Sequence, residues 1–364
     1  MHAITIIGAG SIGNHIANAA RRRDWRVTLT DNDPAALRRA EESIYPSRYG
    51  SWDAAITTCL TQDALARPAD VVFVGTPPDT HIPLALQVLE KAPPRALVLE
   101  KPLCGPDLAG CEELRTRARS HATFVGVGYN HTLGRNTLLA EKLLAEGRLG
   151  EPRTLSARIR EDWGGIFRAH PWLSGPADSY LGSTRRGGGA IGEHSHGINI
   201  WQHFARLLGA GRVSEVSCSL DVVRAAGVEY DRLCLIGLKT ERGLLGEVVQ
   251  DVVTSPPEKL LRAQGSAGYL EWRLHAQPNV DSVAFGVADQ PAEPTLLPKT
   301  RADDFIAEID HLDQVLQGRV QDSPISLARG LETMLVIAAA WKSHQEGRRV
   351  GIDWEQGCRL EALR

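Results

Sequence analysis

The feature that most constrains the fold is a glycine pattern close to the start of the chain. A short apolar run, Ile4–Ile7, leads into Gly8-Ala9-Gly10-Ser11-Ile12-Gly13, and a helix-compatible segment follows up to Arg23. This order predicts a strand, a tight turn and a helix. Gly8 permits the turn, Gly10 lets a diphosphate approach the backbone, and Gly13 lets the helix pack on the strand. The first N–H groups of the helix, at Ser11 and Ile12, then favour an anion, so the segment predicts a dinucleotide site.

An acidic residue stands where such a site needs one. The next apolar run, Arg26–Thr30, ends in Asp31, about 20 residues after the glycines, where a carboxylate can accept hydrogen bonds from the adenosine ribose. A carboxylate would repel a 2′-phosphate, so Asp31 favours NAD, while Arg38 keeps NADP open. The alternative role for Asp31 is a helix cap, but Asp33-Pro34 fits that role better.

Length and composition narrow the class of protein. The 364 residues suffice for two domains, and the formal net charge of −3 is spread over mixed acidic and basic residues. We therefore expect no nucleic-acid or membrane partner. No apolar run reaches the roughly 20 residues that cross a bilayer, which predicts a soluble, cytoplasmic protein. The six cysteines include no C-x-x-C pair, so we expect reduced thiols and no metal site.

The first part of the chain alternates apolar strands with helices. Val71–Gly75, Ala96–Glu100 and Phe124–Gly128 have strand length and no polar alternation, and helix-length segments lie between them. This pattern predicts a parallel sheet covered on both faces, whose ligands sit at the carboxyl ends of the strands. Three polar clusters follow these strands: Thr76–His81, Glu100–Leu103 and Tyr129–His131. We assign residues 1–130 to a Rossmann-type dinucleotide-binding domain.

The pattern of expected helices and strands changes after residue 130. A helix to about residue 147 is followed by an alternating strand at 154–161, a long loop at 162–189 and a helix at 190–208. Consecutive β-like runs then indicate a mostly antiparallel sheet with one open face; they cover residues 213–221, 230–238, 245–253, 259–264 and 269–274. Residues 277–300 hold four prolines and predict a surface excursion. Helices are expected at 304–316 and 330–345, the last able to pack back on the first domain. Residues 131–364 form the expected substrate-binding and oligomerisation domain, so the fold class is α/β followed by α+β.

Several motifs together resemble one known family. Glu100-Lys101-Pro102 at a strand end is similar to the motif of the glucose–fructose oxidoreductase / inositol dehydrogenase (Gfo/Idh/MocA) family. The resemblance extends to Thr76-Pro77 followed by His81, to Gly187-Gly188-Gly189-Ala190 opening a helix with His196, and to the closing Gly347–Val350. It implies hydride transfer between NAD(P) and a secondary alcohol of a sugar or cyclitol, and dimers or tetramers formed through the open sheet. It also implies cofactor contacts at Thr76, Pro77, His81, Glu100 and Lys101.

Lys101 is the first candidate for catalysis. Oxidation of an alcohol removes a hydroxyl proton while hydride leaves the carbon, so a polar group must lie within about 3 Å of that hydroxyl. We expect Lys101 to position and polarise the oxygen, against the alternative of a solvated surface lysine. Similar proteins have a cis bond at the position of Lys101–Pro102.

His196 is the candidate acid/base, and here the chain departs from the inositol dehydrogenase pattern. That pattern has Asp and His four residues apart, and alignment on the glycines puts Glu193 and Gly197 at these positions. Another branch of the family has a Ser-His pair followed by an acid, which Ser195-His196 and Asn199 match better. A continuous helix would put Glu193, His196 and Asn199 on one face. Glu193 is then a helper, Asn199 a substrate contact, and His194 structural.

The remaining substrate candidates follow strands or lie in the long loop. Aromatic faces stack on sugars and polar groups bind their hydroxyls; these candidates are Tyr129, Asn130, Trp163, His170, Trp172 and, for a phosphate, Arg185. The alternatives are a loop stabilised by its own tryptophans and a solvated arginine. We expect an NAD-dependent oxidoreductase acting on a nucleotide sugar or sugar phosphate, with an inositol dehydrogenase or a non-catalytic dinucleotide sensor as alternatives.

Overall fold

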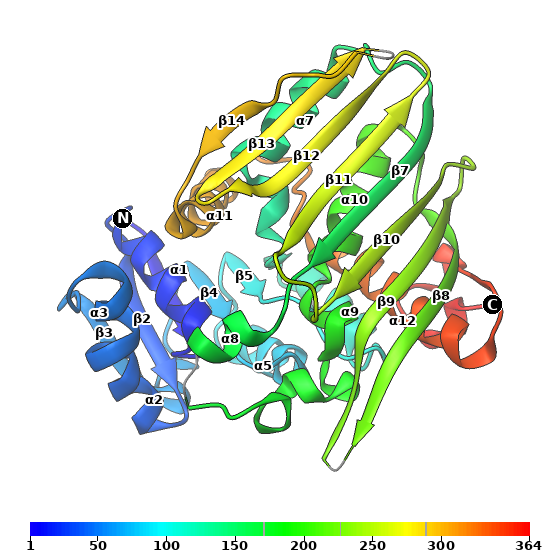
Figure 1. The fold of residues 1–364 in the computed structure, drawn as a ribbon. Helices are drawn as coiled ribbons and strands as arrows, with labels where there is room; N and C mark the ends of the chain where they lie inside the picture. The colour runs from blue at the N-terminus through cyan, green and yellow to red at the C-terminus, as the bar shows by residue number, and fades with distance from the viewer. Residues whose placement is uncertain (170–171, 226, 288–289) are drawn as a thin grey trace. The chain divides into compact units, whose positions relative to one another are not determined.

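The computed structural model divides into two compact units (Figure 1). It describes residues 1–169, 172–225, 227–287 and 290–364. The first unit comprises Met1–Leu103, Gly110–Asn130 and Thr300–Gly330, and the second comprises Cys104–Ala109, His131–Lys299 and Leu331–Arg364. Within the described ranges, no helix combines the length and the apolar character needed to cross a membrane.

The first unit is built on a parallel sheet of six strands in the order β3-β2-β1-β4-β5-β6. Its central strands are apolar and almost entirely buried, as expected for strands covered on both faces. The strands are β1 (Ala3–Ile7), β2 (Arg26–Asp31), β3 (Ile56–Leu60), β4 (Val71–Val74), β5 (Ala96–Leu99) and β6 (Phe124–Val127). The predicted Rossmann-type sheet is therefore confirmed.

Seven α-helices of the first unit cover this sheet; they are α1 (Ser11–Arg21), α2 (Pro34–Arg39), α3 (Tyr45–Tyr49), α4 (Thr61–Ala64), α5 (Pro78–Lys91), α6 (Cys111–Ser120) and α11 (Arg301–Leu316). A π-helical segment, Ala40–Ile44, joins α2 to α3. Helix α11 packs against α1 and buries Phe305, Ile309 and Leu312 in the same core as Ile16.

The grouping of α11 with the first unit differs from the sequence-based division of the chain. The expected second domain of residues 131–364 included Thr300–Gly330, but the structure groups that segment with the first unit. Its apolar face finds its partner on α1, which lies almost 300 residues earlier, and local patterns do not reveal such a pairing. The last helix, α12, belongs to the second unit from Leu331 onward.

The second unit contains a sheet of nine strands in the order β14-β13-β12-β11-β7-β10-β9-β8-β15. All neighbours are antiparallel except β7 and β10, which confirms the mostly antiparallel prediction. The strands are β7 (Pro152–Arg160), β8 (Val213–Ala225), β9 (Val228–Thr240), β10 (Leu245–Asp251), β11 (Glu258–Gly265), β12 (Gly268–Gln277), β13 (Val280–Val287), β14 (Thr295–Pro298) and β15 (Val350–Gly351). β13 and β14 lie where a surface excursion was expected.

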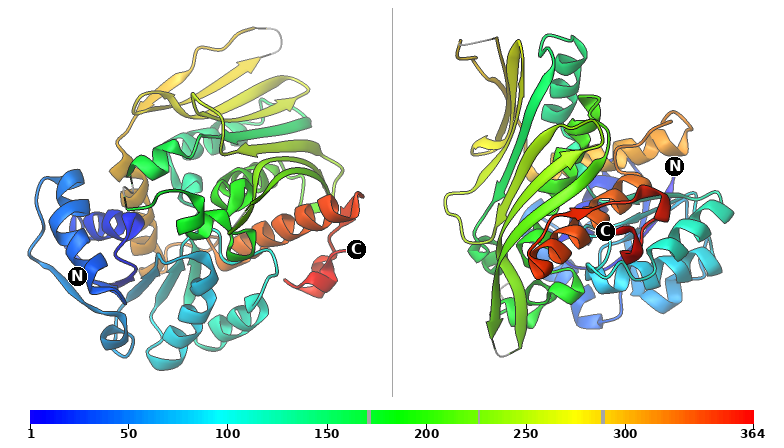
Figure 2. Two further views of the ribbon diagram at one scale, coloured as in Figure 1. Left: turned by 60° about the horizontal axis from the view of Figure 1, so that its bottom comes forward. Right: turned by 90° about the vertical axis from the view of Figure 1, so that its right-hand side faces the viewer.

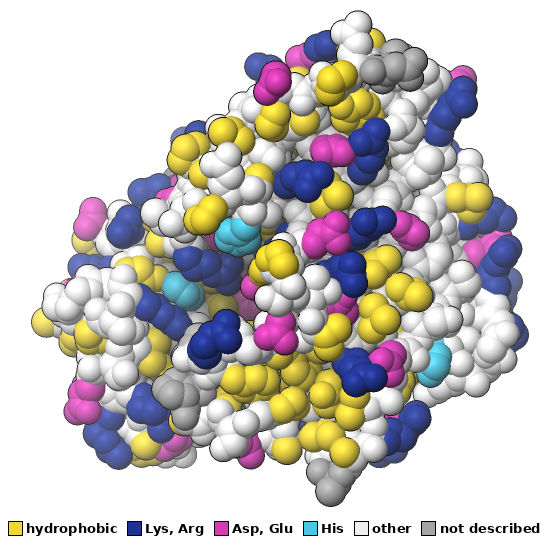
Figure 3. Space-filling view, in the orientation of Figure 1, with side chains coloured by type: hydrophobic (Ala, Val, Ile, Leu, Met, Phe, Trp, Pro, Cys, Tyr) yellow, Lys and Arg dark blue, Asp and Glu magenta, His cyan; other side chains and the backbone are white. Residues whose placement is uncertain are grey.

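Helices cover one face of this sheet, and the other face is open (Figure 2). The helices of the second unit are α7 (Arg135–Ala145), α8 (Gly164–Ala169), α9 (Gly189–Glu193), α10 (His196–Leu207) and α12 (Leu327–Glu346), the last beginning in the first unit. Trp201 of α10 anchors that helix, because its indole N–H donates to the carbonyl of Leu155 on β7 at 2.8 Å. The open face mixes apolar and charged side chains (Figure 3). Leu235 of β9 is half-exposed.

The glycines before α9 are explained by a buried carboxylate. Asp231 on β9 is fully buried, and its Oδ2 accepts the N–H of Ile191 at 2.8 Å. Gly189 has φ +83°, and a Cβ there would lie 2.0 Å from Asp231 Oδ1. Burial raises the pKa of Asp231 to about 8, although backbone N–H groups at the start of α9 oppose that rise. A side chain at residue 189 would therefore displace the carboxyl group that holds α9 on the sheet.

We predict that Gly189→Ala destabilises the protein far more than an alanine at a comparable glycine. Gly243 has a similar φ of +86°, but a Cβ there would meet no described atom within 4 Å. Gly243→Ala should therefore cost only about 1–2 kcal/mol of backbone strain, and Gly189→Ala about 3 kcal/mol or more. Denaturant unfolding of both variants measures the difference; equal losses would contradict the role given to Asp231.

Candidate functional site

The glycine loop of the first unit leaves space beside the start of α1. A Cβ at Gly8, which has φ +110°, would lie 2.7 Å from the carbonyl oxygen of Gly75, and one at Gly13 would lie 1.9 Å from that of Gly8. A Cβ at Gly10 would meet nothing within 4 Å among the described residues. Gly8 and Gly13 therefore serve backbone packing, whereas Gly10 borders open space.

This space belongs to a cavity of about 540 Å³ at the carboxyl ends of β1, β2 and β4. It is lined by the glycine loop, the end of β2, the turn after β4 and the first turns of α5; the lining residues are Gly8, Gly10, Asp31, Asn32, Gly75, Thr76, Pro77, Asp79, Thr80, Pro83, Leu84 and Gln87. Of the predicted cofactor residues, the structure thus brings Gly8, Gly10, Asp31, Thr76 and Pro77 together. Ser11 and Ile12 begin α1 next to them, with no acidic residue in its first turn.

Asp31 is held at the edge of the cavity by backbone groups. Its Oδ2 accepts the N–H of Ala9 at 2.9 Å, and its Oδ1 accepts the N–H of Asp33 at 3.0 Å. These contacts fix the carboxylate beside the glycine loop, where ribose hydroxyls can donate to it. The helix cap of α2 is Asp33, whose Oδ1 accepts the N–H of Ala35. The predicted roles of the two aspartates are therefore separate, as the sequence suggested.

His81 connects the two polar turns of the first unit instead of lining the cavity. Its ring is fully buried, with Nε2 2.7 Å from the carbonyl oxygen of Thr76 and Nδ1 3.1 Å from that of Pro102. Burial lowers its pKa to about 4, so the neutral ring can donate to only one carbonyl at a time. His81 is not among the residues that line this cavity and links the Thr76 turn to the Lys101–Pro102 turn; its contact with the cofactor stays a prediction.

Glu100 and Lys101 follow β5 at the carboxyl edge of the parallel sheet. Glu100 is buried, and its Oε2 accepts the N–H of Lys101 at 3.0 Å. The Lys101–Pro102 bond is cis, like the bond in the similar proteins. A Cβ at Gly128 would lie 2.9 Å from Glu100 Oε1, so glycine at the end of β6 leaves room for the carboxylate. The structure therefore places Lys101 at the strand end where the sequence predicted it.

A second carboxyl group, from α11, was missed by sequence analysis. Glu308 is fully buried, and burial together with the charge of Glu100 raises its pKa to about 8, while the side chain of Asn130 opposes that rise. At neutral pH Glu308 thus carries a proton beside an acidic neighbour. Asn130 and Tyr129, both predicted to bind substrate, are buried in the first unit, where Asn130 faces Glu308. No sequence signal joins Glu308 to Glu100, because the two lie on elements far apart in the chain.

The second unit contains the other predicted catalytic groups. His196 begins α10, and its ring stacks on that of His131, with centroids 3.9 Å apart and planes 23° apart. Glu193 ends α9, and its Oε2 accepts the hydroxyl of Tyr180 at 3.1 Å. The helix expected over residues 190–208 is thus interrupted at His194, because bonds such as Ser195 N–H to the carbonyl of Gly192 tighten the chain into a turn. The shared helix face of Glu193 and His196 is therefore not formed as predicted.

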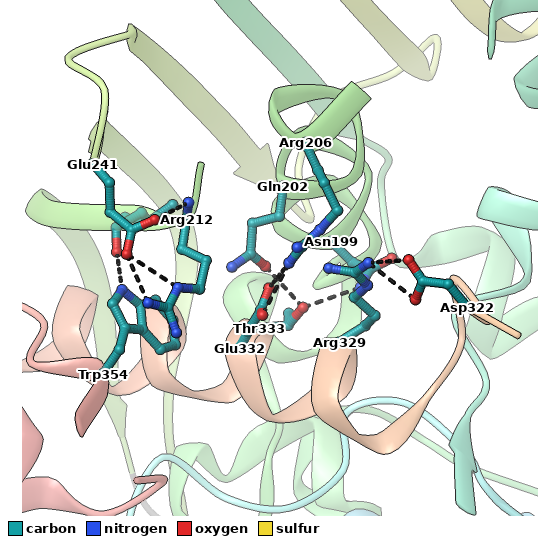
Figure 4. A network of polar contacts seen from close by, with 11 residues as sticks. Asn199, Gln202, Arg206, Arg212, Glu241, Asp322, Arg329, Glu332, Thr333 and Trp354 are labelled. Carbon is teal, nitrogen blue, oxygen red and sulfur yellow. Dashed lines mark hydrogen bonds and ion pairs between the residues drawn. The ribbon is translucent and has the colours of Figure 1, made fainter. Parts of the chain in front are cut away.

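Asn199 takes part in a buried network between α10 and α12 (Figure 4). Its amide donates to Thr333 Oγ1 at 3.1 Å, and the Thr333 hydroxyl donates to Gln202 Oε1 at 2.9 Å. Asn199 is only 4% exposed. These bonds use its amide group to join two helices, and the substrate contact expected of Asn199 stays a prediction. Arg206 and Glu332 extend the network with an ion pair at 2.7 Å.

The candidates of the long loop divide into buried and exposed groups. Trp163 is buried against Tyr230, with ring centroids 5.0 Å apart, and belongs to a small apolar cluster. This packing favours the structural alternative over stacking on a sugar. Trp172 is 44% exposed and Arg185 is exposed, so both side chains are accessible to a ligand. His170 lies outside the described residues.

We predict that Gly10→Ala and Gly13→Ala have opposite consequences. Gly10 has φ −76°, which alanine adopts freely, so Gly10→Ala should leave stability nearly unchanged and weaken NADH binding about tenfold or more, because its methyl group fills the diphosphate position. Gly13→Ala should cost about 3 kcal/mol of stability through the clash with Gly8. Denaturant unfolding and NADH titration measure the two effects, and a stable Gly13→Ala variant would contradict the packing role.

We predict that Glu308→Gln becomes increasingly stabilising as pH rises from 5 to 8. Between the ordinary pKa of 4.5 and about 8, folded Glu308 keeps a proton that the unfolded chain releases. The native protein therefore loses about 1.4 kcal/mol per pH unit relative to the glutamine variant. Unfolding at pH 5.5 and 7.5 measures this change, with the exposed Glu90→Gln as control. A difference independent of pH would show that Glu308 is ionised throughout.

Solved structures share the fold of the whole chain. A putative myo-inositol dehydrogenase from Sinorhizobium meliloti 1021 has 21% identity and a TM-score of 0.73, over 96% of this chain and 99% of that one. The WlbA dehydrogenase from Bordetella pertussis, in complex with NADH and UDP-GlcNAcA, has 18% identity and a TM-score of 0.71, over 96% and 98%. An aldose-aldose oxidoreductase from Caulobacter crescentus, complexed with glycerol, has 20% identity and a TM-score of 0.74, over 96% and 99%.

Family models match both units in sequence. No curated protein matches the chain closely enough to serve as a relative. The model described as "Oxidoreductase family, NAD-binding Rossmann fold" matches residues 3–129, and the model of the GFO/IDH/MocA C-terminal domain matches residues 137–271. The cavity with its open Gly10 and fixed Asp31 fits the NAD that the first model describes. The chain is therefore an NAD-binding oxidoreductase of the Gfo/Idh/MocA family.

Proposed function

We propose that the protein is an NAD-dependent dehydrogenase that oxidises a secondary alcohol of a nucleotide sugar or sugar phosphate. The observation that carries this proposal is the position of Lys101, at the carboxyl end of β5 in the unit that contains the NAD cavity. A lysine ammonium can donate to an alcohol oxygen and stabilise the negative charge that develops on it. When bound, NAD supplies the acceptor for the hydride that leaves the carbon.

The role that we propose for each residue in the reaction follows from the chemistry of its side chain. Lys101 holds the reacting oxygen, and His196, as a neutral imidazole, takes the hydroxyl proton. Glu193, which is oriented by the hydroxyl of Tyr180, accepts hydrogen bonds from the hydroxyls of the sugar.

The packing around Gly197 favours a substrate other than free inositol. The inositol dehydrogenase pattern would place its catalytic histidine at position 197. A Cβ at this position would already lie 3.0 Å from Ile159 Cγ1 and 3.4 Å from the side chain of Gln250. Position 197 thus faces the sheet, which supports His196 as the acid/base. A similar structure, WlbA, contains UDP-GlcNAcA, and the exposed Arg185 is suited to a phosphate.

We also propose a homo-oligomer that forms through the open face of the nine-stranded sheet. Leu235 and Leu245 are 48% and 60% exposed there, beside ion pairs such as Arg232–Asp221. Such a mixture of exposed apolar and paired charged groups is typical of association surfaces; the mass of the protein in solution tests this assignment.

The six cysteines, all free, fit a reducing compartment such as the cytoplasm.

The proposed reaction is tested by NAD reduction with a panel of nucleotide sugars, sugar phosphates, free sugars and cyclitols. We expect a phosphate-bearing sugar to raise the absorbance of reduced nicotinamide. Lys101→Ala should lower kcat about 10²- to 10⁴-fold, because it removes the group that polarises the oxygen, and should weaken NADH binding by a much smaller factor. Lys91→Ala, which removes an exposed lysine at the end of α5, serves as the matched control.

Other results of the same assay distinguish the inositol dehydrogenase and the non-catalytic sensor from the proposed enzyme. Turnover of inositol above that of the phosphate-bearing sugars would establish a cyclitol dehydrogenase. Tight NADH binding without turnover of any class would favour the non-catalytic sensor. Full activity of Lys101→Ala on the true substrate would refute the role proposed for this residue.

A further inference from the structure

Arg48 reaches the start of α1 from a neighbouring helix. It lies on α3, directly after the π-helical segment Ala40–Ile44. Its Nη1 donates to the carbonyl oxygen of Ser11 at 2.9 Å, and its Nη2 donates to the hydroxyl oxygen of Ser11 at 2.9 Å. Ser11 is the first residue of α1 and follows Gly10, next to the NAD cavity. The Arg48 guanidinium therefore lies at the turn where the glycine motif receives the diphosphate.

Among the described residues, none supplies a negative charge that pairs with Arg48. The side chain is half-buried, and no carboxylate in the described part of the chain pairs with it. Burial and the nearby Arg301 lower its pKa, yet a guanidinium stays charged at any physiological pH. By contrast, Arg21 of α1 pairs with Asp53 at 2.8 Å. A half-buried cation without a counter-ion is costly, and an anionic ligand removes this cost.

The aromatic side chains that hold α3 against α1 next to Arg48 carry no charge. The neighbouring Tyr49 hydroxyl lies 2.5 Å from His15 Nδ1 on α1, and the His15 ring stacks on Phe305 of α11, with centroids 4.5 Å apart. Burial, followed by the charges of Arg48 and Arg301, lowers the pKa of His15 to about 3. His15 is therefore neutral and holds α3 against α1 without supplying charge. Because two hydrogen bonds already hold the Arg48 guanidinium on Ser11, binding a ligand would cost it little further side-chain entropy.

We propose that Arg48 binds the diphosphate of NAD together with the N–H groups at the start of α1. Two of its five guanidinium N–H groups are used on Ser11, and described residues use none of the other three. These can donate to diphosphate oxygens as charge-assisted hydrogen bonds, the kind for which arginine is best suited. This assignment concerns the cofactor and is independent of the sugar proposed as substrate.

The test compares Arg48→Met with Arg22→Met in NADH titrations without substrate. Arg22 is exposed at the other end of α1, so its replacement removes the same charge at a remote place. Arg48→Met should weaken NADH and ADP-ribose binding about 10- to 100-fold, the loss of one charge-assisted contact. It should also reduce the dependence of the affinity on KCl, compared at low and at high salt, because a cation–anion contact is lost. Arg22→Met should change neither the affinity for NADH nor its dependence on KCl.

Adenosine, which has no phosphate, separates direct binding from support of the loop. Competition by adenosine should be the same in Arg48→Met and in the native protein, and Arg48→Lys should recover part of the NADH affinity. An equal loss of affinity for adenosine would show that Arg48 only shapes the loop and would overturn the proposal. Unchanged NADH affinity in Arg48→Met would overturn it as well. The melting temperature without cofactor verifies that each variant is folded.

Discussion

The first unit depends on the close approach of backbone to backbone at its glycines. Gly13 lies so near the carbonyl of Gly8, and Gly8 so near that of Gly75, that neither position has room for a side chain. These approaches bring α1, β1 and β4 together at one edge of the sheet. The cavity, the N–H groups of α1 and the fixed carboxylate of Asp31 all follow from them. Contacts within the protein backbone, and not contacts with the cofactor, thus position the groups that line the cofactor site.

The sequence predicted those parts of the fold that are determined by residues close together in the chain. The apolar runs, the glycine spacing and the position of Asp31 are each features of short stretches of chain, and the structure confirms the sheet and the turn that they predicted. β13 and β14 were missed because four prolines interrupt residues 277–300 and because β14 lies at the edge of the sheet, where proline is tolerated. Glu308 and Arg48 were missed because their partners, Glu100 and Ser11, come from elements distant in the chain.

The candidate site was predicted less completely than the fold, and the reason is geometric. The position of Lys101 follows from its place directly after a buried strand. The roles of Glu193 and Asn199 were inferred from a continuous helix, whereas the chain tightens at His194 and starts a new helix at His196. Periodicity does not reveal such an interruption, because the residues on both sides are compatible with a helix. The partner of Asn199 is Thr333, and the sequence contains no sign of that pairing.

The contribution of α11 to the first unit has a consequence for the order in which the protein forms. The core around Ile16 is completed by Phe305, Ile309 and Leu312, which the ribosome adds after strands β7 to β14 of the second unit. During synthesis, the apolar face of the first sheet that α11 covers therefore stays exposed until residues 131–299 have been added and α11 follows. A fragment that ends at residue 130 would keep that face permanently exposed. The unit that begins the sequence is therefore completed only after most of the second unit has been synthesised.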